Sequence, residues 1–254
     1  MQFKISAVII CFNEERNIER CINSALPVAD EILVLDSFSN DRTVEICHKL
    51  GVRLEQHAFD GHIEQKNRAM HMAKFDVVLS LDADEALTEE LQKSILEVKS
   101  NWRQKAYKFN RKTNYCGQWI SHCGWYPDTK IRLWDRRIGK WGGYNPHDKV
   151  ELTNGFEAKW LKGDLAHYSF YTVDEHKQKI ERYSSIKAKA VFARGKKSSQ
   201  LKIWVAPIFK FFWSYVVRLG FLDGAAGFTI CRLSAIESKL TYQKILKLQK
   251  ETVQ

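Results

Sequence analysis

Short apolar segments alternate with longer segments of helical character through the first third of the chain. Buried strands are predicted at residues 5–10, 31–35, 52–56 and 77–81. Helices are predicted between them, ending near Ala25, Leu50 and Ala73. Strands that alternate with helices of this length favour a parallel sheet with right-handed crossover connections. The predicted fold class is therefore α/β, and 254 residues are enough for one such core with an appendage.

Polar side chains follow three of these strands at the point where each strand ends. They are Asn13 and Glu14 after the first strand, Asp36 after the second, and Asp82 and Asp84 after the fourth. Because the carboxyl ends of parallel strands share one edge of a sheet, we expect these side chains to border a single cleft. Asn13 is also expected to cap the first helix.

The aspartates of Asp82-Ala83-Asp84 are candidates for a metal site. Residues i and i+2 of an extended segment point to the same side, so both carboxylates would face one spot. Paired carboxylates suit a hard divalent cation, which usually keeps phosphate oxygens among its ligands. In the alternative interpretation, Asp82 begins a turn and Asp84 helps to cap the following helix.

Together these elements resemble the inverting family 2 glycosyltransferases of the GT-A fold, which use nucleotide-diphosphate sugars. The segments that carry the resemblance are residues 6–15, 36–43, 65–68 and 82–84. Two later segments, 146–150 and 218–224, are similar to the subgroup that adds glucose to the inner-core heptose of bacterial lipopolysaccharide. The resemblance implies a mostly parallel GT-A sheet flanked by helices in residues 1–158, which would bind the nucleotide sugar. A helical C-terminal appendage would follow in residues 159–254.

The resemblance assigns roles to polar residues of the first domain. Asp36 would accept hydrogen bonds from the uracil or ribose, and Asp84 with Asp82 would hold Mg²⁺ or Mn²⁺ against the diphosphate of a UDP-sugar. Lys66 and Arg68 would reach the phosphates or the sugar, unless they are solvated charges on a helix. The other residues assigned to the substrate site are Asn13, Glu14, Trp125 and Arg132.

Glycosyl transfer also needs a base that takes the proton of the acceptor hydroxyl. The resemblance points to Asp148, where related sequences usually carry Glu, and His147 is either the base itself or the residue that orients Asp148. If the pair is not catalytic, it is expected to form a loop ion pair with Lys149. A stacking wall for the acceptor sugar is predicted from Trp119, Trp125 and Tyr126, with core packing as the alternative.

The basic residues concentrate in the last part of the chain. Residues 159–254 contain 18 Lys and Arg against 7 Asp and Glu, a net charge of +11, whereas the rest of the chain carries −1. This part begins with a helix predicted from Thr172 to Arg194, in which Glu175 completes a capping box. A basic surface suits an anionic membrane or a nucleic acid. No nucleic-acid recognition motif is present, so nucleic acid is not expected as a partner.

The apolar segment 204–219 is predicted to be an interfacial helix. Pro207 fits its first turn, and Lys210, Ser214 and Arg218 are spaced by four residues, so they would form one polar line on an otherwise apolar helix. Two basic residues within this segment argue against a helix that spans a membrane. The pattern favours a helix that lies on an anionic membrane surface, and packing against the catalytic domain is the alternative.

The sequence thus predicts a metal-dependent inverting glycosyltransferase that moves a hexose, expected to be glucose, from a UDP-sugar to a lipid-linked saccharide. We expect it in the cytoplasm, peripheral on the inner face of the bacterial inner membrane. Six cysteines without C-x-x-C spacing agree with a reducing compartment. The first alternative is a sugar nucleotidyltransferase, which would need a glycine-rich loop that residues 11–14 lack. The second is a non-catalytic membrane or nucleic-acid adaptor.

Overall fold

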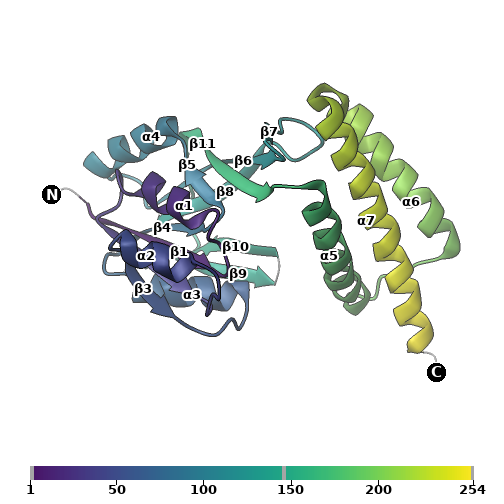
Figure 1. Ribbon diagram of the computed structural model, residues 1–254, viewed down its shortest axis with the longest axis horizontal. Helices are drawn as coiled ribbons and strands as arrows, with labels where there is room; N and C mark the ends of the chain where they lie inside the picture. The colour runs from purple at the N-terminus through teal and green to yellow at the C-terminus, as the bar shows by residue number, and fades with distance from the viewer. Residues whose placement is uncertain (1–2, 145–146, 253–254) are drawn as a thin grey trace. The chain divides into compact units, whose positions relative to one another are not determined.

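The computed structural model describes residues 3–144 and 147–252, with the side chains of all of these except Tyr144 and His147. The chain divides into two compact units (Figure 1). The first unit comprises residues 1–112 and 128–168, and the second comprises residues 113–127 and 169–254. The division that we expected at residues 158–159 falls immediately before a strand, β11 (Lys159–Phe170), most of which belongs to the first unit.

The first half of the first unit is the predicted alternation of strands and helices. Its elements are β1 (Ile5–Cys11), α1 (Ile18–Ala25), β2 (Glu31–Asp36), α2 (Thr43–Lys49), β3 (Arg53–Gln56), α3 (His62–Met72) and β4 (Val77–Asp82). The strands pair in parallel in the order β3-β2-β1-β4. Cys11 pairs with Asp36, and Ile10 pairs with Asp82, so the carboxyl ends of β1, β2 and β4 lie at one edge.

The second half continues this sheet with antiparallel strands. Its elements are β5 (Glu85–Leu87), α4 (Glu89–Ser100), β6 (Ala106–Tyr115), β8 (Asp128–Asp135), β9 (Gly139–Tyr144), β10 (His147–Leu152) and β11. The short strand β7 (Gln118–Trp119) pairs with the last residues of β6, and this pair belongs to the second unit. The sheet runs β3-β2-β1-β4-β8-β6-β11-β5, and β9 with β10 forms a separate antiparallel hairpin. The sequence pattern of alternating strands and helices therefore predicted the parallel half of the sheet. The antiparallel half depends on pairing between strands that lie far apart in the sequence.

Helices cover both faces of the parallel half, which explains its unbroken apolar strands. Ile9 and Leu79 face a core with Ile22 of α1 and Ile95 of α4. On the opposite face, Val8 packs in a core with α3 and with the β9–β10 hairpin. Each large aliphatic side chain buried in this way contributes roughly 1.5–3 kcal/mol.

The second unit consists of helices and the hairpin of residues 113–127. Its helices are α5 (Val173–Ala193), α6 (Gln200–Phe212), a π-helical turn η1 (Trp213–Val217), a 3₁₀ turn η2 (Gly220–Asp223) and α7 (Gly224–Glu251). Both α5 and α6 pack along α7 (Figure 1). Thr172 caps α5 through its hydroxyl, which accepts a hydrogen bond from Glu175 N at 3.1 Å, as predicted.

Two local predictions in the second unit were wrong. Pro207 lies inside α6 and not in its first turn, because the helix begins earlier, at Gln200, where Ser199 caps it. Ser214 does not join Lys210 and Arg218 in an exposed polar line, because its side chain is 2% exposed. Residues 213–217 form a π-helical turn, in which side chains four residues apart no longer lie on the same side as they do in an α-helix.

Candidate active site at the carboxyl edge of the sheet

Hydrogen bonds join the loops that follow β1 and β2. Asn13 N donates to Ser39 Oγ at 2.8 Å, and Asn40 N donates to Asn13 Oδ1 at 2.9 Å. Glu14 N donates to Thr43 Oγ1 at 2.8 Å. Asn13 has a φ of 54° and lies before α1, so it does not cap that helix as predicted. Its side chain holds the two loops together through Asn40, which lies 27 positions further along the chain.

Asp36 is fully buried at the base of these loops. Its carboxylate accepts hydrogen bonds from Ser39 N and Gln56 Nε2, both at 2.9 Å, and from the Ser39 hydroxyl. The Cys11 thiol lies 3.5 Å from the same carboxylate. In this structure Asp36 organises the loop after β2. Its predicted contact with uracil or ribose stays a prediction.

The four residues of the 65–68 segment on α3 contact four different parts of the first unit. Gln65 Nε2 donates to Ser37 Oγ at 3.1 Å. Asn67 binds the backbone of Trp141 through two hydrogen bonds of 2.9 and 3.0 Å, which fasten the β9–β10 hairpin to α3. Arg68 pairs with Asp60 at 2.8 Å. Arg68 thus forms an ion pair with the neighbouring loop, and its predicted contact with phosphate stays a prediction.

Lys66 brings together carboxylates from two distant strands. Its ammonium lies 2.9 Å from Asp82 Oδ1 and 2.7 Å from Asp148 Oδ2. The side chain is nearly buried, and the ammonium lies 4.3 Å from the ring centre of Trp141. Lys66 is therefore a buried cation of the site and not a solvated charge on a helix.

Arg132, on β8, holds the other oxygen of Asp82. Its Nη2 lies 2.9 Å from Asp82 Oδ2 and 2.6 Å from Glu85 Oε1. Burial by itself would raise the pKa of Asp82, but Lys66 and Arg132 outweigh that effect and hold the pKa well below its usual range. Asp82 therefore stays ionised, with both oxygens already engaged by cations.

Two buried N–H donors in this group lack an acceptor. Within the described part of the chain, neither Arg132 Nε nor Trp141 Nε1 has a hydrogen-bond partner. An unsatisfied buried donor costs roughly 1–3 kcal/mol. A buried water within reach of either donor would satisfy it.

Asp84 pairs with a histidine that the sequence analysis did not identify. His167 Nε2, on β11, lies 3.2 Å from Asp84 Oδ2, and Tyr168 N donates to the Asp84 carbonyl at 2.8 Å. Asp84 does not cap the following helix, because Thr88 caps α4. His167 lies in no local motif and reaches Asp84 through the pairing of β11 with β5, so the linear sequence carried no signal for it.

The Asp84–His167 pair fits a divalent metal in its donor chemistry. A carboxylate oxygen and an imidazole nitrogen are common ligands of Mn²⁺ and of other divalent cations. Among the described residues, no group of three or more His, Cys, Asp or Glu side chains is arranged to hold a metal ion. A metal at Asp84 would therefore need ligand oxygens from a substrate.

The candidate base Asp148 lies in β10, opposite Gly143 of β9. Lys149 pairs with Glu151 at 3.5 Å, so the proposed ion pair between Asp148 and Lys149 is not formed. His147 begins β10, but its side chain lies outside the described residues, as does Pro146. The structure thus brings Asp148 to Lys66 and Asp82 and says nothing of His147 as a base.

Trp125 belongs to the second unit. Its ring stacks on Phe170 at a centroid distance of 5.6 Å and meets Tyr115 and His176 at 5.8 and 5.9 Å. This aromatic cluster corresponds to the core-packing alternative for Trp125. Trp125 is half-buried in this cluster, and its predicted contact with the acceptor sugar stays a prediction.

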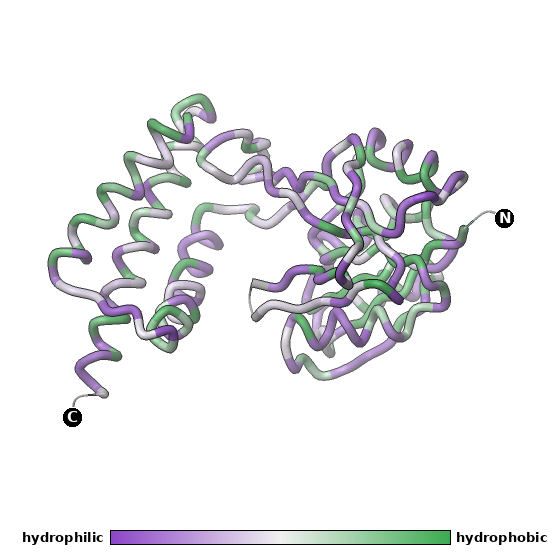
Figure 2. The backbone as a smooth tube through the Cα atoms, turned by 180° about the vertical axis from the view of Figure 1, so that it is seen from behind, coloured by the Kyte–Doolittle hydropathy of each residue, from purple (hydrophilic) through white to green (hydrophobic). Residues whose placement is uncertain are grey.

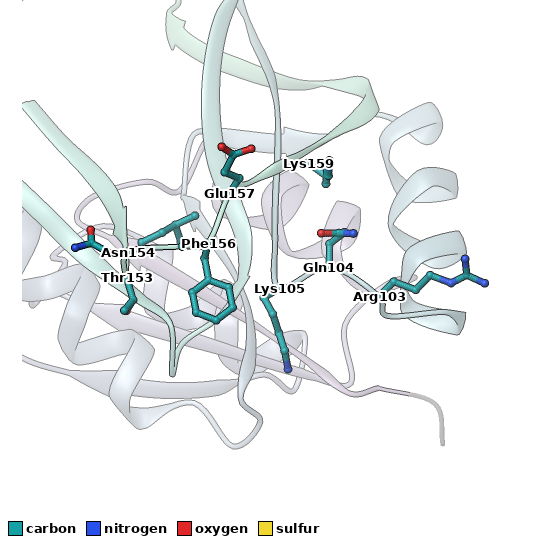
Figure 3. Close-up of a pocket in the computed structure, with 10 residues that line it drawn as sticks. Arg103, Gln104, Lys105, Thr153, Asn154, Phe156, Glu157 and Lys159 are labelled. Atoms are coloured by element: carbon teal, nitrogen blue, oxygen red, sulfur yellow. The ribbon is translucent and has the colours of Figure 1, made fainter.

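A cavity of about 610 Å³ lies at the opposite end of the sheet (Figure 3). Its lining includes Arg103, Lys105, Asn154, Phe156 and Lys159. Val77, at the amino end of β4, pairs with Asp135, and the neighbouring Trp134 pairs with Ala106, so β6 begins at this end. Asp82 ends β4 at the other edge. This cavity is therefore separate from the candidate active site.

Comparison with known proteins identifies the family of the chain. Residues 6–163, more than half of the chain, match the family described as glycosyl transferase family 2. The chain is 31% identical, over 96% of its length, to an uncharacterised glycosyltransferase of Rickettsia typhi, of which it covers 87%. It is 27% identical, over 95% of its length, to the lipopolysaccharide core biosynthesis glycosyltransferase LpsC of Rhizobium meliloti, of which it covers 91%.

One solved structure matches part of the chain. Glucosyl-3-phosphoglycerate synthase from Mycobacterium tuberculosis, in complex with Mn²⁺, uridine diphosphate and glucosyl-3-phosphoglycerate, matches with a TM-score of 0.37 and 23% identity over 44% of each chain. That match covers less than half of either protein.

The fold and the family match define a glycosyltransferase of the GT-A type, as the sequence predicted. The chain belongs to glycosyl transferase family 2. This membership sets aside the nucleotidyltransferase and adaptor alternatives.

Proposed function

We propose that the enzyme transfers a hexose, with inversion, from a UDP-sugar to a lipid-linked saccharide. UDP-glucose is the proposed donor, and the inner-core heptose of lipopolysaccharide is the proposed acceptor. The observation that carries the proposal is the convergence of Asp82 and Asp148 on Lys66 at the carboxyl edge of a family 2 sheet, with Asp84 two residues beyond Asp82. Open α/β sheets bind their ligands at this edge.

In the proposed reaction, Asp148 accepts the proton of the acceptor hydroxyl. The hydroxyl oxygen forms a bond to the anomeric carbon while the bond from that carbon to the diphosphate oxygen breaks. Single displacement of this kind inverts the anomeric configuration. Lys66 holds the Asp148 carboxylate in place, and the positive charges of Lys66 and Arg132 favour the build-up of negative charge on the departing UDP.

Asp84 and His167 would hold Mg²⁺ or Mn²⁺ in this enzyme. Such a cation, when bound, supplies Lewis-acid stabilisation to the diphosphate leaving group. Asp82 is less suited as a second ligand than the sequence suggested, because Lys66 and Arg132 occupy both of its oxygens. Its proposed role is to keep these two cations at the donor site.

Two observations support a lipid-linked acceptor. The relative LpsC is named for lipopolysaccharide core biosynthesis, and the second unit combines basic residues with exposed aromatic side chains. We place the enzyme at the cytoplasmic face of the bacterial inner membrane as a peripheral protein. An anionic membrane surface is its proposed partner, and nucleic acid is not.

The proposal is tested by incubating the purified enzyme with UDP-sugars one at a time, with Mg²⁺, Mn²⁺ or a chelator, and with lipopolysaccharide truncated at the inner core. We expect metal-dependent release of UDP and transfer of one hexose in β linkage from UDP-glucose. Release of UDP from none of the sugars under any of these conditions would overturn the proposed donor. Transfer of the hexose with retained configuration would overturn the single displacement.

A further inference from the structure

The outer side of α6 and η1 carries a continuous row of exposed apolar side chains, which we call the apolar stripe. Its members recur every three or four residues along α6, as on one side of a helix, and continue through η1 to Val217. Figure 2 colours the backbone by hydropathy, and hydrophobic and hydrophilic positions alternate along the helices of the second unit. They include Trp204, Ile208, Phe209, Phe212 and Trp213. Ile208 is 71% exposed and Phe209 is 62% exposed. A contiguous exposed surface of this kind indicates an interaction site, whereas scattered apolar residues do not.

The apolar surface continues into the turn between α6 and α7. Leu219, Phe221 and Leu222 are 44%, 46% and 58% exposed, and we call them the apolar tip. The turn beneath them is tightly packed, since a Cβ on Gly227 would lie 1.9 Å from the Gly220 carbonyl oxygen. The tip is therefore presented on a compact turn and is not a loose loop.

The charges around the apolar stripe are mostly positive. Residues 196–236 contain six Lys and Arg and one acid, Asp223. Asp223 is buried, and its carboxylate accepts hydrogen bonds from Ser121 N and His122 N. Lys239 of α7 lies 4.4 Å from the ring centre of Trp204. Exposed aromatics beside basic side chains are typical of surfaces that meet lipid headgroups.

We propose that α6 and the apolar tip penetrate one leaflet of an anionic bilayer, with the apolar stripe facing the acyl chains. A second copy of the chain fits this surface less well, because symmetric contact would bring like charges together. An anionic leaflet accommodates the apolar side chains and the cations at once. This inference deepens the proposed function, on which it rests for the nature of the acceptor.

The lengths of the helices agree with shallow penetration. Among the described residues, no single helix is long and apolar enough to cross a membrane. The segments Gln200–Val217 and Gly220–Glu251 are long and apolar enough to cross a membrane only when they are taken together, and the chain bends by 74° between them. Penetration from one side requires no spanning helix, because the helix lies in the plane of the interface.

Flotation with lipid vesicles tests the proposal. The full-length protein is mixed with vesicles of phosphatidylcholine, with or without phosphatidylglycerol, at low and at high salt. We expect tighter binding to the anionic vesicles and a bound fraction that persists at high salt, because salt screens charge but not apolar burial. Lipids brominated in their acyl chains should quench the tryptophan emission, and the Trp204→Phe, Trp213→Phe variant should lose most of that quenching.

Substitutions test whether vesicle binding depends on the apolar stripe or on any exposed apolar side chain. The Phe212→Ser, Trp213→Ser variant should bind vesicles at least roughly tenfold more weakly, since two large apolar side chains no longer leave water. The Phe221→Ser, Leu222→Ser variant of the apolar tip should also bind vesicles more weakly than the wild type. Trp160→Ser is the matched control, because Trp160 is 52% exposed but lies in the first unit, and binding should not change. Circular dichroism checks that each variant is folded.

Three results would overturn the proposal. They are no vesicle binding, binding that high salt abolishes without any quenching, and a dimer that forms without lipid and is lost in the Phe212→Ser, Trp213→Ser variant. Donor hydrolysis in solution is measured alongside. Vesicle binding without metal-dependent release of UDP would refute the proposed function but not the proposed membrane surface. Metal-dependent release of UDP without vesicle binding would refute the membrane surface but not the proposed donor chemistry.

Discussion

The ammonium of Lys66 lies 2.7 Å from the carboxylate of Asp148, a residue 82 positions further along the chain. The same ammonium contacts Asp82 at the end of β4. One helix side chain therefore connects the strand that ends in the Asp-Ala-Asp motif with the hairpin that carries the candidate base. Without Lys66, Asp148 would lose its cation, and Asp82 would keep only Arg132.

Replacement of Lys66 by methionine should therefore destabilise the first unit. We expect a loss of about 2 kcal/mol in the free energy of unfolding, because both carboxylates are partly exposed and water screens part of the repulsion. Urea unfolding measures the change. Lys66→Arg keeps the positive charge and should lose less. Equal midpoints for the wild type and Lys66→Met would show that the cation does not hold the carboxylates.

Replacement of Asp148 by asparagine should lower turnover and leave donor binding nearly unchanged. A base acts on the acceptor in the transition state, so its loss typically reduces the rate about 10²–10⁴-fold. Turnover is measured by UDP release, and donor affinity by calorimetric titration. If donor affinity falls sharply and turnover stays normal, Asp148 belongs to the donor site.

Asp84→Asn and His167→Gln should each weaken metal binding and transfer, with Asp84→Asn abolishing most of the activity. The reason is the 3.2 Å contact between their side chains, which places an oxygen and a nitrogen ligand together. Electron paramagnetic resonance of Mn²⁺ in the presence of UDP reports binding directly. Asp76→Asn, a change at the opposite end of β4, serves as the control. Unchanged Mn²⁺ affinity in both site variants would place the metal elsewhere.

Asp223→Ala should loosen the hairpin of residues 113–127 in the second unit. The Asp223 carboxylate accepts hydrogen bonds from Ser121 N at 3.2 Å and from His122 N at 2.8 Å. Their loss leaves two backbone donors without these partners and should cost about 2 kcal/mol. Hydrogen exchange should become faster at both amides, while β1 to β4 keep their protection. Unchanged exchange at Ser121 and His122 would contradict this role.

His176 should make the second unit sensitive to acid. Burial, and secondarily Lys179, lowers the pKa of His176 to about 4. Between pH 6.5 and 4 the unfolded chain binds a proton that the folded unit does not, so stability is full above this window and falls as the pH drops through it. The expected loss across this window is about 3 kcal/mol. Thermal unfolding of His176→Gln from pH 7 to 4 should show a weaker dependence than the wild type.

The linear sequence was sufficient for the parts of the fold that local patterns specify. The strands β1 to β4 and their helices follow from apolar runs and helical periodicity, and the Thr172 cap follows from a four-residue motif. The motif at Asp82 and Asp84 could be placed at a strand end for the same reason. The position of Pro207 within its helix was not predicted correctly. The apolar segment that indicated the helix begins at Trp204, whereas α6 begins at Gln200.

The sequence by itself thus determined the α/β class, the family and the edge of the sheet where the candidate site residues lie. Only the tertiary structure decided which side chains meet there: His167 reaches Asp84 through β11, and Lys66 neutralises Asp82 and Asp148. These contacts join residues far apart in the chain. A contact between distant residues depends on strand order and helix packing, and neither is encoded in the spacing of neighbouring residues.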